Sequence, residues 1–185
     1  MARDFSCQPF EFGGGFLFAQ LIDSSLGMGF GVLSSSLLLA LGFPPFAISP
    51  TIHTAEIFAG GSSALSHYKL GNIDRALLKK IAPAALIGAL MGSVLIIYFP
   101  ANNLKDYLGI YFLLIGFVIV LKAINKNMIS PLKIKRRLLG FFGGFFDAFC
   151  GAGWGEFVSS GLLIRGQDTR LTVGTLNTAE FFVTI

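Results

Sequence analysis

The sequence is poor in charged residues, cysteine and histidine. Only 13% of its 185 residues are charged, and it holds two cysteines and two histidines. A soluble domain of this size needs charged and polar side chains over most of its surface, and a chain that is 54% apolar has too few of them. The composition therefore excludes an ordinary soluble domain and indicates a protein whose apolar surface lies in lipid.

The small number of cysteines and histidines also limits which kinds of site the chain can form. Cys7 and Cys150 lie in different surroundings and have no paired spacing, so neither a disulfide nor a zinc motif is indicated. With two histidines and no cysteine pair, we expect no metal site and no cofactor. The aromatic residues are mostly Phe inside apolar runs, and no basic stripe accompanies them, so nucleic-acid binding is not expected.

Long apolar runs are what the sequence does contain. Ile81–Phe99 and Tyr107–Ile124 are each close to the length of a bilayer core, and the segment Pro100–Asp106 between them is typical of a turn. Further runs are Phe12–Phe46 and Leu138–Ile164, both interrupted, then Pro50–Tyr68, and a last one that begins near Leu171. The sequence predicts an all-α, multi-pass protein of the cell (inner) membrane.

Basic residues predict how the spans are oriented. The linker Lys69–Lys80 holds four of them and Lys122–Arg137 holds six, whereas the intervening turn holds only Lys105. Lysine and arginine favour the cytoplasmic side. Both basic linkers are therefore expected in the cytoplasm. The two spans between them agree with this, because two crossings return the chain to the same side of the membrane.

An internal duplication is the strongest pattern. With an offset of 124 positions (147 − 23), Asp23–Phe58 aligns with Asp147–Phe182 without a gap, and 14 of the 36 aligned pairs are identical. Membrane composition alone would align some Leu and Gly, but not an Asp, two Thr and a Glu together. We predict a first repeat over residues 1–124, a basic cytoplasmic linker over 125–137 and an incomplete second repeat over 138–185.

The two copies are expected to have opposite orientations. Leu41–Thr51 carries no positive charge, whereas its counterpart Arg165–Thr175 carries two, so the two segments should face opposite sides. Inversion needs an odd number of crossings per copy, which makes Phe12–Phe46 a hairpin that enters and leaves on one side. A single long kinked crossing would give parallel copies instead.

Each copy begins with alternating glycines. These are Gly27, Gly29 and Gly31 in the first copy and Gly151, Gly153 and Gly155 in the second. Such glycines weaken a helix, and a broken helix in lipid must be buried in protein or line a wet cavity, where its N–H groups suit an anion. The alternative is that they only let helices approach closely.

A second duplicated element carries polar and ionisable groups. It comprises Thr51, His53, Thr54 and Glu56, and in the second copy Thr175, Asn177, Thr178 and Glu180. On a helix, His53 and Glu56 are neighbours at i and i+3. Ionisable groups within a span tend to point inward toward a partner or a water path. The alternative is that these groups lie near a membrane surface or bond to a neighbouring helix as a structural link.

Four carboxylates remain to be assigned. Glu56 and Glu180 are candidates for proton coupling or for structural links between helices. Asp23 and Asp147 each precede a glycine triplet by four residues and could take up a proton or cap the broken helix, and we favour the cap.

The glycine-rich openings, the Thr-x-x-Thr-Ala-Glu elements and the duplicated apolar layout together resemble the sulfite exporter TauE/SafE family of permeases. The resemblance implies transport of sulfite or organosulfur anions across the cell membrane. It also implies duplicated halves around a site formed by Gly27–Gly31, Gly151–Gly155 and the elements around Thr54 and Thr178. The second copy stops at Ile185, before two further spans, so we expect a C-terminally truncated chain.

The leading hypothesis is thus a secondary transporter of a small anion, whose partners are that anion and the lipid bilayer. A homo-oligomer is left open. An intramembrane enzyme is not favoured, because no nucleophile–base pair stands out. A non-transporting scaffold or accessory subunit is the alternative that truncation leaves in place.

Overall fold

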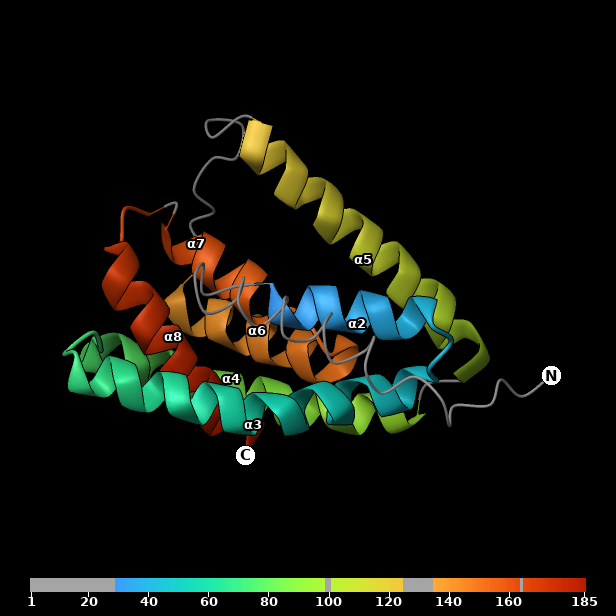
Figure 1. Ribbon diagram of the computed structural model, residues 1–185, viewed down its shortest axis with the longest axis horizontal. Coiled ribbons are helices and arrows are strands. Elements are labelled where there is room, and N and C mark those ends of the chain that lie inside the picture. Colours follow the sequence, from blue (N-terminus) through green and yellow to red (C-terminus); the bar gives the residue numbers. More distant parts are fainter. Residues whose placement is uncertain (1–28, 99–100, 125–134, 164) are drawn as a thin grey trace.

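The computed structural model of the protein describes residues 29–98, 101–124, 135–163 and 165–185 (Figure 1). Within these ranges the backbone is helical and forms no strand, which confirms the predicted all-α class. The elements are α2 (Phe30–Ala40), α3 (Pro45–Lys69), α4 (Arg75–Tyr98), α5 (Ala101–Ile124), α6 (Arg136–Cys150), the π-helix η2 (Trp154–Ser159), α7 (Ser160–Leu163) and α8 (Thr169–Thr184).

Two long helices present apolar side chains to the outside. Among the described helices, α4 is the one whose length and hydropathy suit a membrane crossing, and only 22% of its most apolar window is buried. Its 24 residues span about 36 Å, more than the roughly 30 Å hydrocarbon core. Leu113 and Phe117 of α5 are likewise 75% and 61% exposed. Large exposed apolar surfaces of this kind suit lipid better than water.

Helix boundaries correct several expected loops. Pro100–Asp106 was predicted as a turn, but α5 already begins at Ala101, so most of that segment is helical. In the same way α3 begins at Pro45, inside the expected linker Leu41–Thr51, because a proline in the first helical turn needs no N–H partner. The linkers before α3 and α5 are therefore shorter than we predicted from their polar and proline residues.

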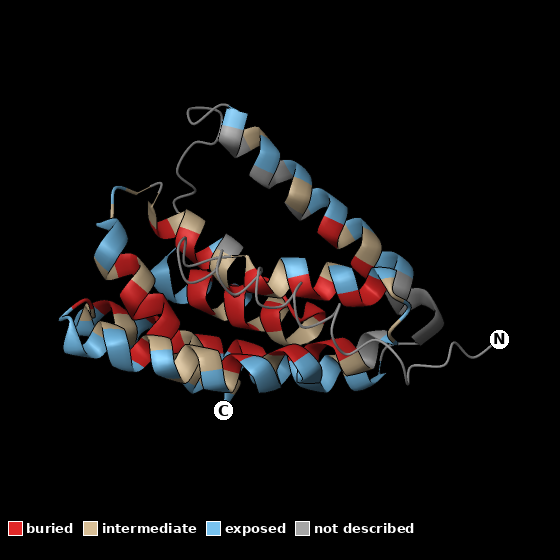
Figure 2. Cartoon of the chain, in the orientation of Figure 1, coloured by how far each residue is buried: buried red, intermediate tan, exposed pale blue. Residues whose placement is uncertain are grey.

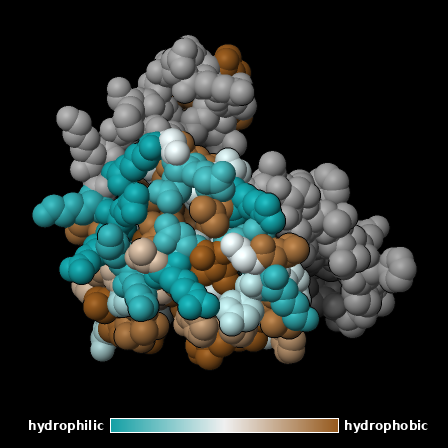
Figure 3. Space-filling view, turned by 90° about the vertical axis from the view of Figure 1, so that its left-hand side faces the viewer, coloured by the Kyte–Doolittle hydropathy of each residue, from teal (hydrophilic) through white to brown (hydrophobic). Residues whose placement is uncertain are grey.

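Basic residues gather at one end of the helices. Lys69 ends α3, Arg75 begins α4, Arg136 begins α6, and Arg170 lies in the first turn of α8. Figure 1 places these helix ends on the left, and Figure 3, which views that end, shows hydrophilic side chains clustered there. That this end faces the cytoplasm stays a prediction from the charge count.

The segment from α6 to α7 turns back on itself as a hairpin. The hairpin predicted for Phe12–Phe46 lies partly outside the described residues. Arg136, at the start of α6, donates a hydrogen bond of 3.1 Å to Gln167, just after α7. The chain therefore enters with α6 and returns with η2 and α7 to the same end (Figure 1). The α2–α3 turn lies at the opposite end from the α7–α8 turn, which is the placement that inverted copies would need. The duplication itself stays a prediction.

Small residues allow α4 and α6 to pack closely. A Cβ atom on Gly88 would overlap the carbonyl oxygen of Phe141, and one on Gly144 would overlap that of Ala85. Side chains of any size would push the two backbones apart. Such small-residue contacts are a main way in which helices associate in lipid. Figure 2 shows the buried residues concentrated where α3, α4, α6 and α8 face one another.

We predict that Gly144→Ala lowers the stability of the folded protein by about 1–3 kcal/mol, because its methyl group would collide with the Ala85 backbone. Gly116→Ala on α5 is the matched control, since nothing lies within 4 Å of its added Cβ. Alanine forms helix better than glycine by about 1 kcal/mol, so this control should be neutral or stabilising. Unfolding of the purified protein in SDS measures the stability of each variant. Equal changes in stability for Gly144→Ala and Gly116→Ala would contradict close packing of α4 on α6.

Candidate functional site

The start of α2 meets the interruption between α6 and η2 inside the bundle. Gly29, directly before α2, has φ 116°, and Gly151 and Gly153, between α6 and η2, have φ 70° and 153°. Side chains other than glycine rarely adopt these angles. Gly31 lies against this second break, because a Cβ on it would be 3.1 Å from both the Gly151 oxygen and the Ala152 Cα. The two glycine motifs predicted from sequence are thus in contact.

Hydroxyl groups from the first half bond the carbonyls that the second break leaves free. Ser35 of α2 donates to the Gly151 oxygen, and Ser49 of α3 donates to that of Ala148 at 2.9 Å. Tyr111 of α5 donates to the Ala152 oxygen, also at 2.9 Å. An unpaired carbonyl buried in lipid would cost several kcal/mol. These bonds therefore fix the broken segment and tie three helices to it.

A histidine and two carboxylates lie beside the break. His53 Nδ1 is 2.8 Å from Glu56 Oε2 on the same helix, and His53 Nε2 is 4.0 Å from Asp147 Oδ2 on α6. One ligating atom from each residue lies within 4.8 Å of the other two, a spacing that suits a shared proton or a small cation. Asp147 and Glu56 are both buried. The cluster joins a helix of each predicted repeat.

Asp147 also faces the start of the π-helix. Its Oδ1 lies 3.4 Å from the backbone nitrogen of Trp154, where a capping carboxylate would lie. The Trp154 ring is buried and donates from Nε1 to the Leu176 carbonyl at 3.2 Å, which connects the break to α8. The carboxylate thus has two faces, one toward backbone N–H and one toward His53.

The predicted Thr and Asn residues divide into two groups. On α8, Thr175, Asn177 and Thr178 are buried, and the Asp74 backbone nitrogen donates to the Thr175 hydroxyl at 2.8 Å. The threonines of α3 are instead exposed and bond the carbonyls one turn back along their own helix. The described structure therefore does not bring the α3 threonines to the break.

The remaining predicted residues have varied placements. Gly155 is half-buried within η2, and Glu180 is half-buried on α8, outside the histidine–carboxylate cluster. Gly27 and Asp23 lie outside the described residues. The atom grouping of His53, Glu56 and Asp147 would also suit a metal ion, although two histidines in the sequence led us to expect none. That expectation stays a prediction.

Three side chains of the site escaped sequence reasoning. Ser49 could have been found, since it lies one helical turn before His53 and so shares its face. Tyr111 and Trp154 sit in apolar runs, where nothing in the pattern separates an aromatic that bonds a carbonyl from one that packs in the core. Only the fold shows what their polar atoms meet.

This helical architecture, with a broken helix, a buried ionisable cluster and apolar outer faces, is typical of a polytopic membrane protein. Residues 12–185 match the model of the family described as Sulfite exporter TauE/SafE, and the chain belongs to this family. Membership of this family places the chain among membrane proteins.

Two curated relatives support the family assignment. The chain is 37% identical over 178 residues to the probable membrane transporter protein YtnM of Bacillus subtilis (strain 168). This match covers 91% of the present chain and 59% of that protein. It is 29% identical over 153 residues to the probable membrane transporter protein ORF9 of a Sinorhizobium species, covering 78% and 57%. The chain therefore spans under two thirds of both relatives. No solved structure matches it.

We predict that Tyr111→Phe lowers stability by about 1 kcal/mol, because the Ala152 carbonyl loses its donor. Tyr98→Phe on α4 is the control, since the Tyr98 side chain is 78% exposed. Unfolding in SDS again gives the difference. If both variants matched the wild type, the hydrogen bond would not contribute to holding the break.

Proposed function

We propose that the protein is a secondary transporter that carries a small anion, with sulfite or an organosulfur anion as the expected substrate. It would act as a multi-pass protein of the cell (inner) membrane. The observation that carries the proposal is the contact between the start of α2 and the break after α6, where Gly31 lies against Gly151 and Ala152. Interrupted helices buried in a membrane protein are a common way to build a substrate site near the bilayer midplane.

Backbone N–H groups supply the attraction for the anion. The first N–H groups of a helix have no partner within that helix, and they carry the positive end of its dipole. The start of α2 follows Gly29 directly, and the Gly29 N-cap position carries no side chain that could cap it. Ser34, one turn into the same helix, has a buried hydroxyl without a partner among the described residues. These groups favour an oxyanion, which accepts hydrogen bonds on several sides.

The histidine–carboxylate cluster suits proton coupling. Two carboxylates near an anion site would repel the substrate, and protons taken up there would remove that repulsion. His53 lies between Glu56 and Asp147, at 2.8 Å and 4.0 Å, and in its protonated form would place a positive charge between them. Because Asp147 belongs to α6 and His53 to α3, gain or loss of this proton would alter a link between the two repeats. Such a link could bias alternating access.

Uptake or export by proteoliposomes tests the function. With the complete gene product reconstituted, we expect radiolabelled sulfite or a sulfonate to accumulate when a pH gradient is imposed, and a protonophore to abolish the accumulation. Absence of flux for every anion tried, with the protein folded, would remove the proposal in favour of a scaffold or accessory role.

Variants separate proton coupling from substrate binding. Glu56→Gln and Asp147→Asn should each reduce gradient-driven accumulation at least tenfold, because neither amide takes up the proton, while exchange of substrate across the membrane persists. Asp106→Asn is the matched control, since Asp106 is an exposed carboxylate on α5. Loss of accumulation and exchange together in both site variants would indicate that the carboxylates are structural.

A further inference from the structure

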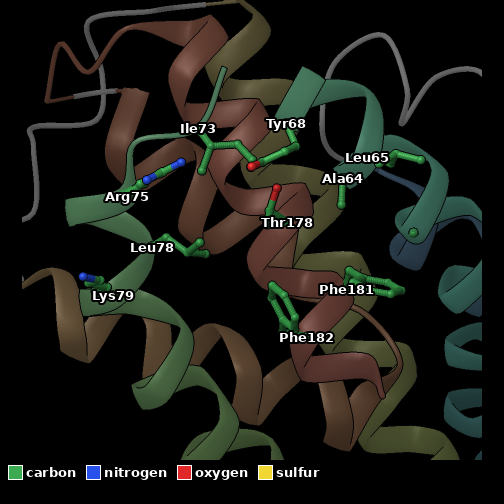
Figure 4. A pocket seen from close by; sticks show the side chains of 11 residues that line it. Ala64, Leu65, Tyr68, Ile73, Arg75, Leu78, Lys79, Thr178, Phe181 and Phe182 are labelled. Carbon is green, nitrogen blue, oxygen red and sulfur yellow. The ribbon is translucent and has the colours of Figure 1, made fainter. Parts of the chain in front are cut away.

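A groove at the basic end of the bundle is lined by none of the cluster residues His53, Glu56 and Asp147. Thr178, which the family resemblance places in the transport site, is one of its lining residues. The groove lies between the last turns of α3, the first turns of α4 and the end of α8, and its volume is about 570 Å³ (Figure 4). Its walls are largely apolar, with Leu65, Leu78, Phe181 and Phe182 among the lining residues. Leu65 and Phe182 are also more than half exposed, so the groove opens to the surroundings of the protein.

Two cations line the same groove. Arg75 and Lys79 are four residues apart on α4, hence on one face of that helix, and both are exposed. Figure 4 places them on one side of the groove and the Phe181 and Phe182 rings on the other. Within the described part of the chain, neither Arg75 nor Lys79 forms an ion pair with a carboxylate.

The position of the groove along the membrane normal sets its surroundings. Arg75 and Lys79 belong to the end where the other basic residues gather, which the charge count assigns to the cytoplasm (Figure 3). Tyr68, also a lining residue, is 63% exposed at this level. Tyrosine with an apolar ring and a polar hydroxyl favours the boundary between headgroups and acyl chains. The cations thus lie at headgroup height and the apolar wall extends toward the bilayer.

We propose that this groove binds an anionic phospholipid of the cytoplasmic leaflet. The phosphate would lie against Arg75 and Lys79, and an acyl chain would lie along Leu65, Leu78 and Phe182. A zwitterionic lipid offers the same chain but no net negative charge to two unpaired cations. Basic sites between helices on this side of the membrane recognise acidic headgroups in this way. A free phosphate would use the cations but leave the apolar wall uncovered.

The test counts bound lipids by native mass spectrometry of the complete gene product from micelles with equal phosphatidylglycerol and phosphatidylcholine. We expect the wild type to retain about tenfold more phosphatidylglycerol than phosphatidylcholine. The double variant Arg75→Gln with Lys79→Gln should retain the two lipids in about equal amounts. Lys80→Gln with Arg137→Gln is the matched control, since both are exposed cations at the same end that do not line the groove, and it should keep the preference.

Two further arms distinguish the ligand source. Leu65→Ser with Phe182→Ser should lower retention of both lipids several-fold, because the apolar wall is lost. An excess of inorganic phosphate should not displace phosphatidylglycerol. Three results would each overturn the proposal. The groove and control charge variants could lose the lipid preference equally, the serine variant could retain as much lipid as the wild type, or inorganic phosphate could displace phosphatidylglycerol. None of these readouts depends on transport, so they stand apart from the proposed function.

Discussion

Every backbone polar group in a lipid-embedded protein needs an internal partner, and this requirement governs the centre of the structure. The chain between α6 and η2 leaves regular α-helix at Gly151–Gly153, which frees carbonyls in the interior. Ser35, Ser49 and Tyr111 supply the missing donors from α2, α3 and α5. Because these donors belong to the first half of the chain and the acceptors to the second, the broken segment is held only when both halves are docked.

The same constraint limits where charge can reside. A lone carboxylate inside the bundle would be costly, and Asp147 lowers that cost by facing the Trp154 N–H on one side and His53 on the other. Glu56 lies against the other nitrogen of His53. A site that contains two acids and one base can change its charge by one proton without leaving any group wholly unpartnered. This property is what a coupling site needs and what a purely structural link does not require.

Sequence reasoning succeeded where a local pattern has a physical cause. The i,i+3 spacing of His53 and Glu56 predicted their contact, and the second set of alternating glycines predicted the break between α6 and η2. It failed where distant segments decide the outcome, since nothing in the sequence near Asp147 indicates that His53 lies 4.0 Å away. The turn expected at Pro100–Asp106 was wrong for a related reason: polar residues end a span, but they do not end a helix that continues into the headgroup region.

The two copies of the Thr-rich element illustrate how one pattern acquires two environments. Gly174 and Thr175 of α8 pack against the chain at Asn72 and Asp74, so this face is buried. The matching face of α3, which includes Thr51 and Thr54, is exposed and its hydroxyls bond their own helix. A threonine that bonds its own helix can face an apolar neighbour without leaving a donor unpaired. The exposed α3 face is therefore chemically suited to contact with another helix or with lipid, and a role in substrate contact would require its hydroxyls to exchange those bonds.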